Sequence, residues 1–153
     1  MQDHYSYPSG FKYDVVNFSD DPVVSDETLE TFNAKEKSAQ MYEYVLRMTE
    51  HYQGNHMFIP WGDDFTYSDA HLTFSSPDHL IEYFNSHYSD MTLKYSTPSE
   101  YLDAIKGEDL VWPVRYDDMF PYADQNEDYW TGYFSSRAVS KRMTRAVQAN
   151  MHA

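Results

Sequence analysis

The sequence contains no cysteine, which excludes a disulfide scaffold, a thiolate metal site and a cysteine nucleophile. It has no apolar run near the length of about 18 residues that a membrane-spanning helix needs. Basic residues are few, because 11 Lys and Arg stand against 25 Asp and Glu, and the formal net charge is −14. Such a surface repels phosphate backbones and anionic lipids, so we expect no nucleic acid and no membrane as partners.

What the chain does contain is typical of a folded protein. Its 153 residues are 41% hydrophobic and 18% aromatic, which is too rich in aromatic side chains for a disordered chain. The length suits one domain or a part of one. The first residues show no basic segment followed by an apolar one, so we expect no signal peptide in this chain.

Three segments carry signals for helix starts. Asn33 and Thr97 are each followed three residues later by a glutamate, which is the pattern of a capping box. Ser76 precedes a proline, which is favoured at the first position of a helix. We therefore expect helices from Asn33 to about Gln53, from Ser76 onward, and from Thr97 to near residue 107.

Short apolar segments at 56–61, 91–95 and 110–112 alternate with these helices and predict strands. Alternation of helix and strand is typical of an α/β protein with a parallel sheet. Three strands are too few for a closed α/β barrel, which takes about 250 residues. The sequence therefore predicts one part of a larger α/β architecture.

The end of the chain is basic. Four basic residues and no acidic ones follow Tyr133, and their spacing puts most of them on one side of a helix. An apolar stripe on another side consists of Val139, Met143 and Val147. The basic face is either simply solvated or a docking surface for an acidic partner.

The most informative motif is Gly62-Asp63-Asp64, directly after a predicted strand. Ligands of parallel α/β folds bind at the carboxyl ends of strands. The flanking Trp61 and Phe65 are expected to raise a carboxyl pKa, as does a neighbouring like charge, and such a carboxyl suits a general acid. The alternative is an Asp-rich turn that caps the next element.

A second acidic pair, Asp117 and Asp118, lies near the aromatic residues Tyr129, Trp130 and Tyr133. Aromatic rings pack on the apolar face of a sugar, and carboxylates accept hydrogen bonds from its hydroxyls. The segment therefore predicts either a sugar-binding surface or aromatic packing under a long loop. The seven histidines form no metal-binding motif, and neither a phosphate-binding loop nor a serine-hydrolase elbow is present.

Several blocks of the sequence resemble glycoside hydrolase family 38, the retaining, zinc-dependent α-mannosidases, and the lysosomal type in particular. The blocks that carry the resemblance are 10–15, 33–36, 62–67, 95–101, 120–124 and 129–137. They occur in the order and spacing of the family. The block Tyr-Trp-Thr-Gly-Tyr-Phe-Ser-Ser-Arg at 129–137 is highly specific.

The resemblance implies a fold. The family has a seven-stranded α/β barrel, a three-helix middle domain and large β domains. Residues 1–128 would then be the later part of the catalytic barrel, and residues 129–153 the start of the helical middle domain. The expected partners of this chain are the remaining parts of the catalytic and β domains and a mannose-containing glycan.

The resemblance also implies site residues. Asp64 falls on the acid/base aspartate of the family, and Asp63 lies beside it where it would contact the sugar. Tyr13 and Asp14 fall where the family contributes substrate-binding residues. Retaining glycosidases need a second carboxyl group about 5–5.5 Å away, as the nucleophile. That nucleophile and the zinc ligands are absent from this chain, and none of its histidines aligns with a ligand position.

The expected function is thus hydrolysis of terminal α-linked mannose, with this chain carrying the acid/base half of the site and inactive alone. The resemblance implies the lysosome or a secretory or vacuolar lumen as the location. A noncatalytic carbohydrate-binding or interaction module is the alternative. A truncated gene model or pseudogene is a third.

Overall fold

A computed structural model describes residues 5–15 and 19–153 of the chain. Residues 1–4, on which the expectation of no signal peptide partly rests, lie outside the described residues. The chain divides into two units, Met1–Val111 and Trp112–Ala153, which are described separately below. No helix in the described ranges is both long enough and apolar enough to cross a membrane.

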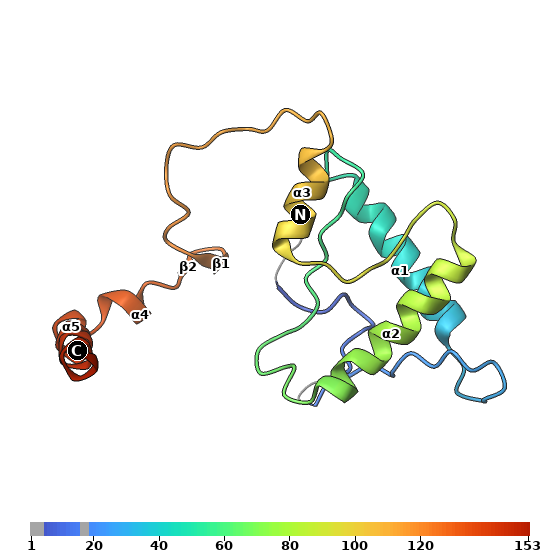
Figure 1. The fold of residues 1–153 in the computed structure, drawn as a ribbon, viewed down its shortest axis with the longest axis horizontal. Helices are drawn as coiled ribbons and strands as arrows, with labels where there is room; N and C mark the ends of the chain where they lie inside the picture. The colour runs from blue at the N-terminus through green and yellow to red at the C-terminus, as the bar shows by residue number, and fades with distance from the viewer. Residues whose placement is uncertain (1–4, 16–18) are drawn as a thin grey trace. The chain divides into compact units, whose positions relative to one another are not determined.

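The first unit is built around a pair of helices. Helix α1 spans Ala34–Thr49 and helix α2 spans Ala70–His87, and the two lie against each other (Figure 1). Helix α3 spans Pro98–Lys106. The core between these elements consists of buried hydrophobic residues, namely Phe11, Val23, Ala34, Met41, Val45, Leu80 and Phe84.

Helix α1 confirms the predicted helix, but two of its details differ. It ends at Thr49, four residues before the expected Gln53. The capping box expected at Asn33 is wrong, because this side chain makes no cap hydrogen bond. Its Oδ1 instead accepts from the backbone N–H of Val24 at 2.8 Å, and its Nδ2 donates to the carbonyl of Pro22 at 2.9 Å. Asn33 therefore fixes the preceding loop rather than the helix start.

Helix α2 begins six residues before the predicted start at Ser76. Asp69 caps it, since its side chain accepts a hydrogen bond from the backbone of the first turn, and Pro77 lies inside the helix. A proline there removes one backbone hydrogen bond. Buried contacts hold the turn before it, because Ser76 Oγ accepts from Val23 N at 3.0 Å and Thr73 is also buried. Tertiary packing overrides the local signal for a helix start.

Helix α3 is as predicted. The Thr97 side chain accepts from the backbone N–H of Glu100 at 3.2 Å, and the Glu100 side chain accepts from the Thr97 backbone at 2.8 Å. Both halves of the capping box are present, with proline at the first helical position. The helix ends at Lys106, one residue before Gly107.

The three predicted strands are wrong. The structure describes segments 56–61, 91–95 and 110–112 in full, and none of them is a strand. Segment 56–61 nonetheless keeps the alternation of a strand, since Met57, Ile59 and Trp61 pack against the core. A strand requires backbone hydrogen bonds to a neighbouring segment, and these segments belong to no hydrogen-bonded sheet in the described parts of the chain. The parallel sheet and the barrel are therefore not shown.

The second unit contains the strands that the structure does have. Strands β1, Ala123–Gln125, and β2, Asp128–Tyr129, form an antiparallel pair in which Ala123 faces Tyr129. This hairpin was not predicted from the sequence. It crosses the expected domain boundary after residue 128, whereas the division into units falls after residue 111. The boundary at 128 stays a prediction.

Two helices complete the second unit. Helix α4 spans Gly132–Ser135 and helix α5 spans Ala138–His152, so the predicted terminal helix is confirmed. None of the residues of α5, all of which the structure describes, is buried. Its apolar stripe of Val139, Met143 and Val147 is exposed, and so are most of its basic residues.

Candidate functional site

The Gly62-Asp63-Asp64 motif lies in a tight turn whose backbone is unusual. Gly62 has φ +147°, and Phe65 and Tyr67 have φ +62° and +63°, in the left-handed region that side chains disfavour. Thr66 closes the turn, because its side chain donates to the Asp63 carbonyl at 2.8 Å and accepts from the Asp63 N–H at 3.2 Å. The two carboxyl groups are therefore presented by a strained but well-bonded loop.

Glycine is required at position 62 for two reasons. Its φ is disfavoured for residues with a Cβ, and a Cβ added there would lie 2.8 Å from Cε2 of the Tyr67 ring. The Tyr67 hydroxyl donates to the carbonyl of Trp61, and this hydrogen bond between the two ends of the turn fixes the Tyr67 ring. A side chain at position 62 and the present position of Tyr67 exclude each other.

We therefore expect Gly62→Ala to lower the free energy of unfolding by about 1–3 kcal/mol. Urea unfolding followed by circular dichroism measures the change. Gly132→Ala is the matched control, because its added Cβ would meet only Ser136 Oγ at an ordinary 3.8 Å. Equal unfolding midpoints for Gly62→Ala and the parent chain would show that the turn has no such requirement.

Asp63 is the better-bonded of the two carboxylates. One oxygen accepts from Ser6 Oγ at 2.8 Å and lies 3.6 Å from Lys12 Nζ, and the other accepts from the Asp64 backbone at 2.9 Å. The hydrogen bonds from the Asp64 backbone and Ser6, with a smaller effect of Lys12, lower the pKa of Asp63. For Asp63 this is the opposite of the raised pKa expected for a carboxyl of the motif, and it keeps Asp63 ionised.

Asp64 is exposed. Its Oδ1 accepts a hydrogen bond of 2.8 Å from the hydroxyl of Tyr5. The adjacent Phe65 side chain is 85% exposed and so does not shield the carboxyl group from water. The apolar surroundings expected for Asp64 are thus not supplied by the part of the chain that the structure describes.

Asp14 is the buried carboxylate of the region, with none of its surface exposed. Its Oδ2 accepts from Thr73 Oγ1 at 2.7 Å, from Tyr7 Oη at 3.2 Å and from the backbone N–H of Tyr67 at 3.4 Å. Tyr13, the other expected substrate-binding residue, is half-buried beside it in the chain. The fold thus places Asp14 beside the turn that contains Asp63, although the two residues are about 50 positions apart in the sequence.

A groove lies next to this region. It has a volume of about 730 Å³ and is open, and its walls are the N-terminal segment and the end of α1. Ser6 and Lys12, which contact Asp63, line it together with Arg47 and His51. Neither carboxylate of the Asp63–Asp64 pair is part of its lining.

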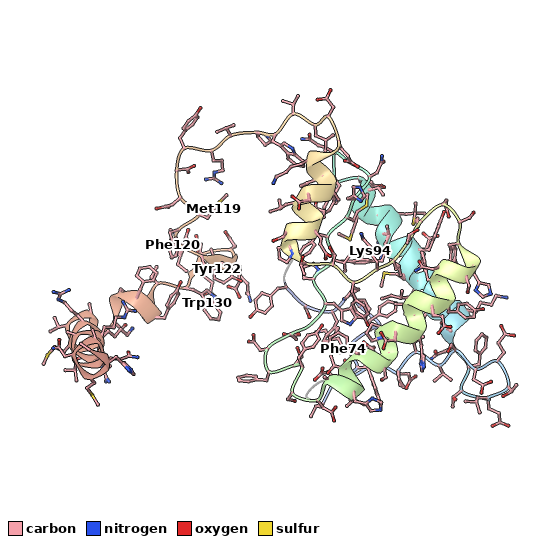
Figure 2. The ribbon with its side chains drawn as sticks, in the orientation of Figure 1. Phe74, Lys94, Met119, Phe120, Tyr122 and Trp130 are labelled. Carbon is pink, nitrogen blue, oxygen red and sulfur yellow. The ribbon has the colours of Figure 1, made fainter. Side chains whose placement is uncertain are left out.

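The second acidic pair has local structural roles. Asp117 forms an ion pair of 2.6 Å with Arg115, and Asp118 accepts from the backbone N–H of Phe120 at 3.2 Å. The aromatic residues near them are exposed as well. Trp130 donates from its ring nitrogen to Asp124 at 2.9 Å, and its ring lies 5.8 Å from that of Tyr122 (Figure 2).

The described residues do not fit a zinc ion. Among residues 5–15 and 19–153, no group of three or more His, Cys, Asp or Glu side chains could hold a metal. The one ion pair of a histidine that the structure gives joins His56 to Glu108 at 3.7 Å, which is a pair without a third ligand.

The residues that surround the turn were not predicted from the sequence. Tyr5, Ser6, Tyr7 and Thr73 all bond to one of the three aspartates of the region. Most of these contacts span 57–59 residues of sequence. No local pattern or spacing could have revealed such partners, because they meet only in the folded chain.

Comparison with known proteins gives one consistent result. The family model described as the glycosyl hydrolases family 38 N-terminal domain matches residues 1–125. The lysosomal alpha-mannosidase of Dictyostelium discoideum is 39% identical over 150 residues, covering 97% of this chain and 15% of that relative. The Homo sapiens lysosomal alpha-mannosidase is 37% identical over 144 residues, covering 92% of this chain and 14% of that relative.

A plant protein, a probable alpha-mannosidase of Arabidopsis thaliana, is 39% identical over 146 residues, covering 94% of this chain and 14% of that relative. This chain therefore spans about one-seventh of the length of the curated relatives that it matches. The family model covers most of the chain, and the identity to each relative extends over nearly all of it. The chain belongs to glycosyl hydrolase family 38.

Proposed function

We propose that this chain supplies the acid/base part of the active site of a retaining α-mannosidase. The observation that carries the proposal is the match to family 38 over most of the chain, with relatives that are named alpha-mannosidases. The substrate is then a glycan that ends in α-linked mannose. The remaining parts of a catalytic α/β barrel and of β domains are the partners of this chain, and the lysosome is the proposed location.

In this proposal Asp64 acts twice. It first protonates the departing glycosidic oxygen, and it then takes a proton from the water that attacks the glycosyl-enzyme. Its exposed position on the turn allows both transfers, and the hydrogen bond from Tyr5 orients one of its oxygens. Apolar side chains around Asp64 come, in this proposal, from the rest of the active site.

Asp63 and Tyr13 are the proposed substrate contacts. Asp63 is ionised, with a lowered pKa, and can accept hydrogen bonds from sugar hydroxyls. Its hydrogen bonds to Ser6 and the Asp64 backbone hold it beside the acid/base group. The described residues offer no zinc site.

We expect the isolated 153-residue chain to release no mannose from an aryl α-mannoside, with or without added zinc. The resemblance to the family places no nucleophile in this chain, and Asp64 is exposed to water rather than enclosed by apolar side chains. Absorbance of the released aryl alcohol measures the reaction. Zinc-dependent release by the purified chain would contradict this proposal.

A second test places this chain in a complete enzyme. The matching 150-residue segment of the Dictyostelium discoideum relative is replaced by the corresponding residues of this chain. We expect the chimera to hydrolyse mannosides at a rate within about tenfold of the unmodified relative. A chimera that shows a cooperative thermal transition but no hydrolysis would overturn the proposed function.

A noncatalytic sugar-binding module is the second candidate, favoured by the exposed aromatic side chains around the hairpin. Tyr129, Trp130 and Tyr133 are all at least half exposed. Titration of the isolated chain with mannose, followed by tryptophan fluorescence, distinguishes the two candidates. Saturable binding supports the module, and an unchanged spectrum favours a part of an enzyme.

A further inference from the structure

Three segments far apart in the sequence meet at one buried carboxylate. Asp14 accepts from Tyr7 in the N-terminal segment, from Thr73 in α2 and from the backbone of Tyr67 in the Asp63–Asp64 turn. All three bonds reach the same oxygen, Oδ2. A buried carboxylate is stable only when such donors surround it, so these contacts fix one another.

The turn needs such support. Phe65 and Tyr67 both adopt the left-handed backbone conformation, which is strained for residues with side chains and persists only where the surroundings impose it. The bonds of Thr66 to Asp63 fix the first half of the turn. The bond from the Tyr67 N–H to Asp14 fixes the second half and connects the turn to α2 through Thr73.

We infer that Asp14 is a positioning residue that holds the turn carrying Asp64, rather than a group that touches the sugar. No part of the Asp14 side chain is exposed, so its carboxylate meets no solvent or ligand in this chain. The effect on Asp64 is indirect, through Tyr67 three residues further along. This inference rests on the proposed acid/base role of Asp64.

Amide hydrogen exchange in the 153-residue chain tests the positioning role without any need for activity. We expect Asp14→Ala to speed exchange of the Tyr67 N–H by about tenfold or more. Exchange of Val45 in α1 and Phe84 in α2, both in the core, should change by less than about twofold. Asp14→Asn, which keeps a carbonyl oxygen as acceptor, should give a rate at Tyr67 between those of the parent chain and the alanine variant.

Asp26→Ala is the matched control, because Asp26 is an exposed aspartate whose side chain, among the described residues, bonds only to Thr28 in its own turn, at 2.7 Å. It should leave exchange at Tyr67 unchanged. An unchanged rate at Tyr67 in Asp14→Ala, or an equal increase at Tyr67 and the core amides, overturns the inference. If the alanine variant does not fold, the same comparison in Asp14→Asn decides whether Asp14 holds the turn.

The mannosidase chimera gives a second readout that a general loss of stability would not produce. We expect Asp14→Asn to lower kcat on a natural oligomannoside by about tenfold and to leave KM within about twofold. The loss should be smaller on aryl mannosides with good leaving groups, which need little protonation. A raised KM with unchanged kcat would make Asp14 a substrate contact and overturn the inference. A folded chimera that is inactive with Asp14 intact rejects the proposed function, and the exchange data then still decide the role of Asp14.

Discussion

In the completed enzyme, Asp64→Asn is expected to lower kcat/KM for a natural oligomannoside by about 10²–10⁴-fold. Positioned proton transfer contributes about this factor to a reaction. The amide is nearly the same size as the carboxyl group and can still accept the hydrogen bond from Tyr5, so the turn should keep its structure. The loss would therefore report the missing proton rather than a misfolded site.

Substrates with different leaving groups distinguish a missing proton donor from a misfolded site. Aryl mannosides whose alcohol leaves as a stable anion should lose far less in the first step, because their departure requires no proton. Steady-state kinetics with a series of aryl mannosides of decreasing leaving-group pKa measures the difference. Asp26→Asn, on an exposed turn of the same unit, is the control and should keep full activity. Undiminished cleavage of the oligomannoside by the Asp64→Asn enzyme would remove Asp64 from the acid/base role.

The largest effect on stability is expected from Phe84→Ala. Phe84 has no exposed surface, and its ring stacks on Tyr88 with a centroid separation of 4.6 Å. Removal of a buried phenylalanine ring costs about 3–5 kcal/mol, through lost transfer free energy and the cavity left behind. Domains are stable by only about 5–15 kcal/mol, so the first unit should lose a large part of its stability.

Thermal unfolding followed by circular dichroism measures this loss. A decrease of at least about 12 °C in Tm is expected for a unit of this size. Phe65→Ala removes the same ring from a side chain that is 85% exposed, and its effect should stay within about 0.5 kcal/mol. Equal Tm values for the two variants would mean that the pair of helices α1 and α2 does not stabilise this unit.

The helices show which features of the fold can be predicted from local sequence. Helix α3 begins at its capping box and proline, because both signals act within one turn of the helix. The start of α2 could not be predicted in this way. Pro77 signals a helix start, but the buried contacts of Ser76 and Thr73 continue the helix through it.

The strand predictions were wrong for a related reason. The apolar segment at 56–61 does contact the core, through Met57, Ile59 and Trp61. A strand, however, is a property of two segments, and pairing depends on backbone that local sequence does not specify. The hairpin of β1 and β2 was missed because its strands are three and two residues long, too short for a periodic pattern.

For the candidate site, the sequence by itself determined the residue types. Gly62 followed by two aspartates establishes a turn with adjacent carboxyl groups, and the blocks around it establish the family. Only the tertiary structure decided the state of each aspartate: Asp14 is buried, Asp63 has a lowered pKa, and Asp64 is exposed. The physical reason is that burial and hydrogen bonding set the charge of a carboxyl group. At Asp14 and Asp63, the side-chain partners lie up to 59 residues away in the sequence.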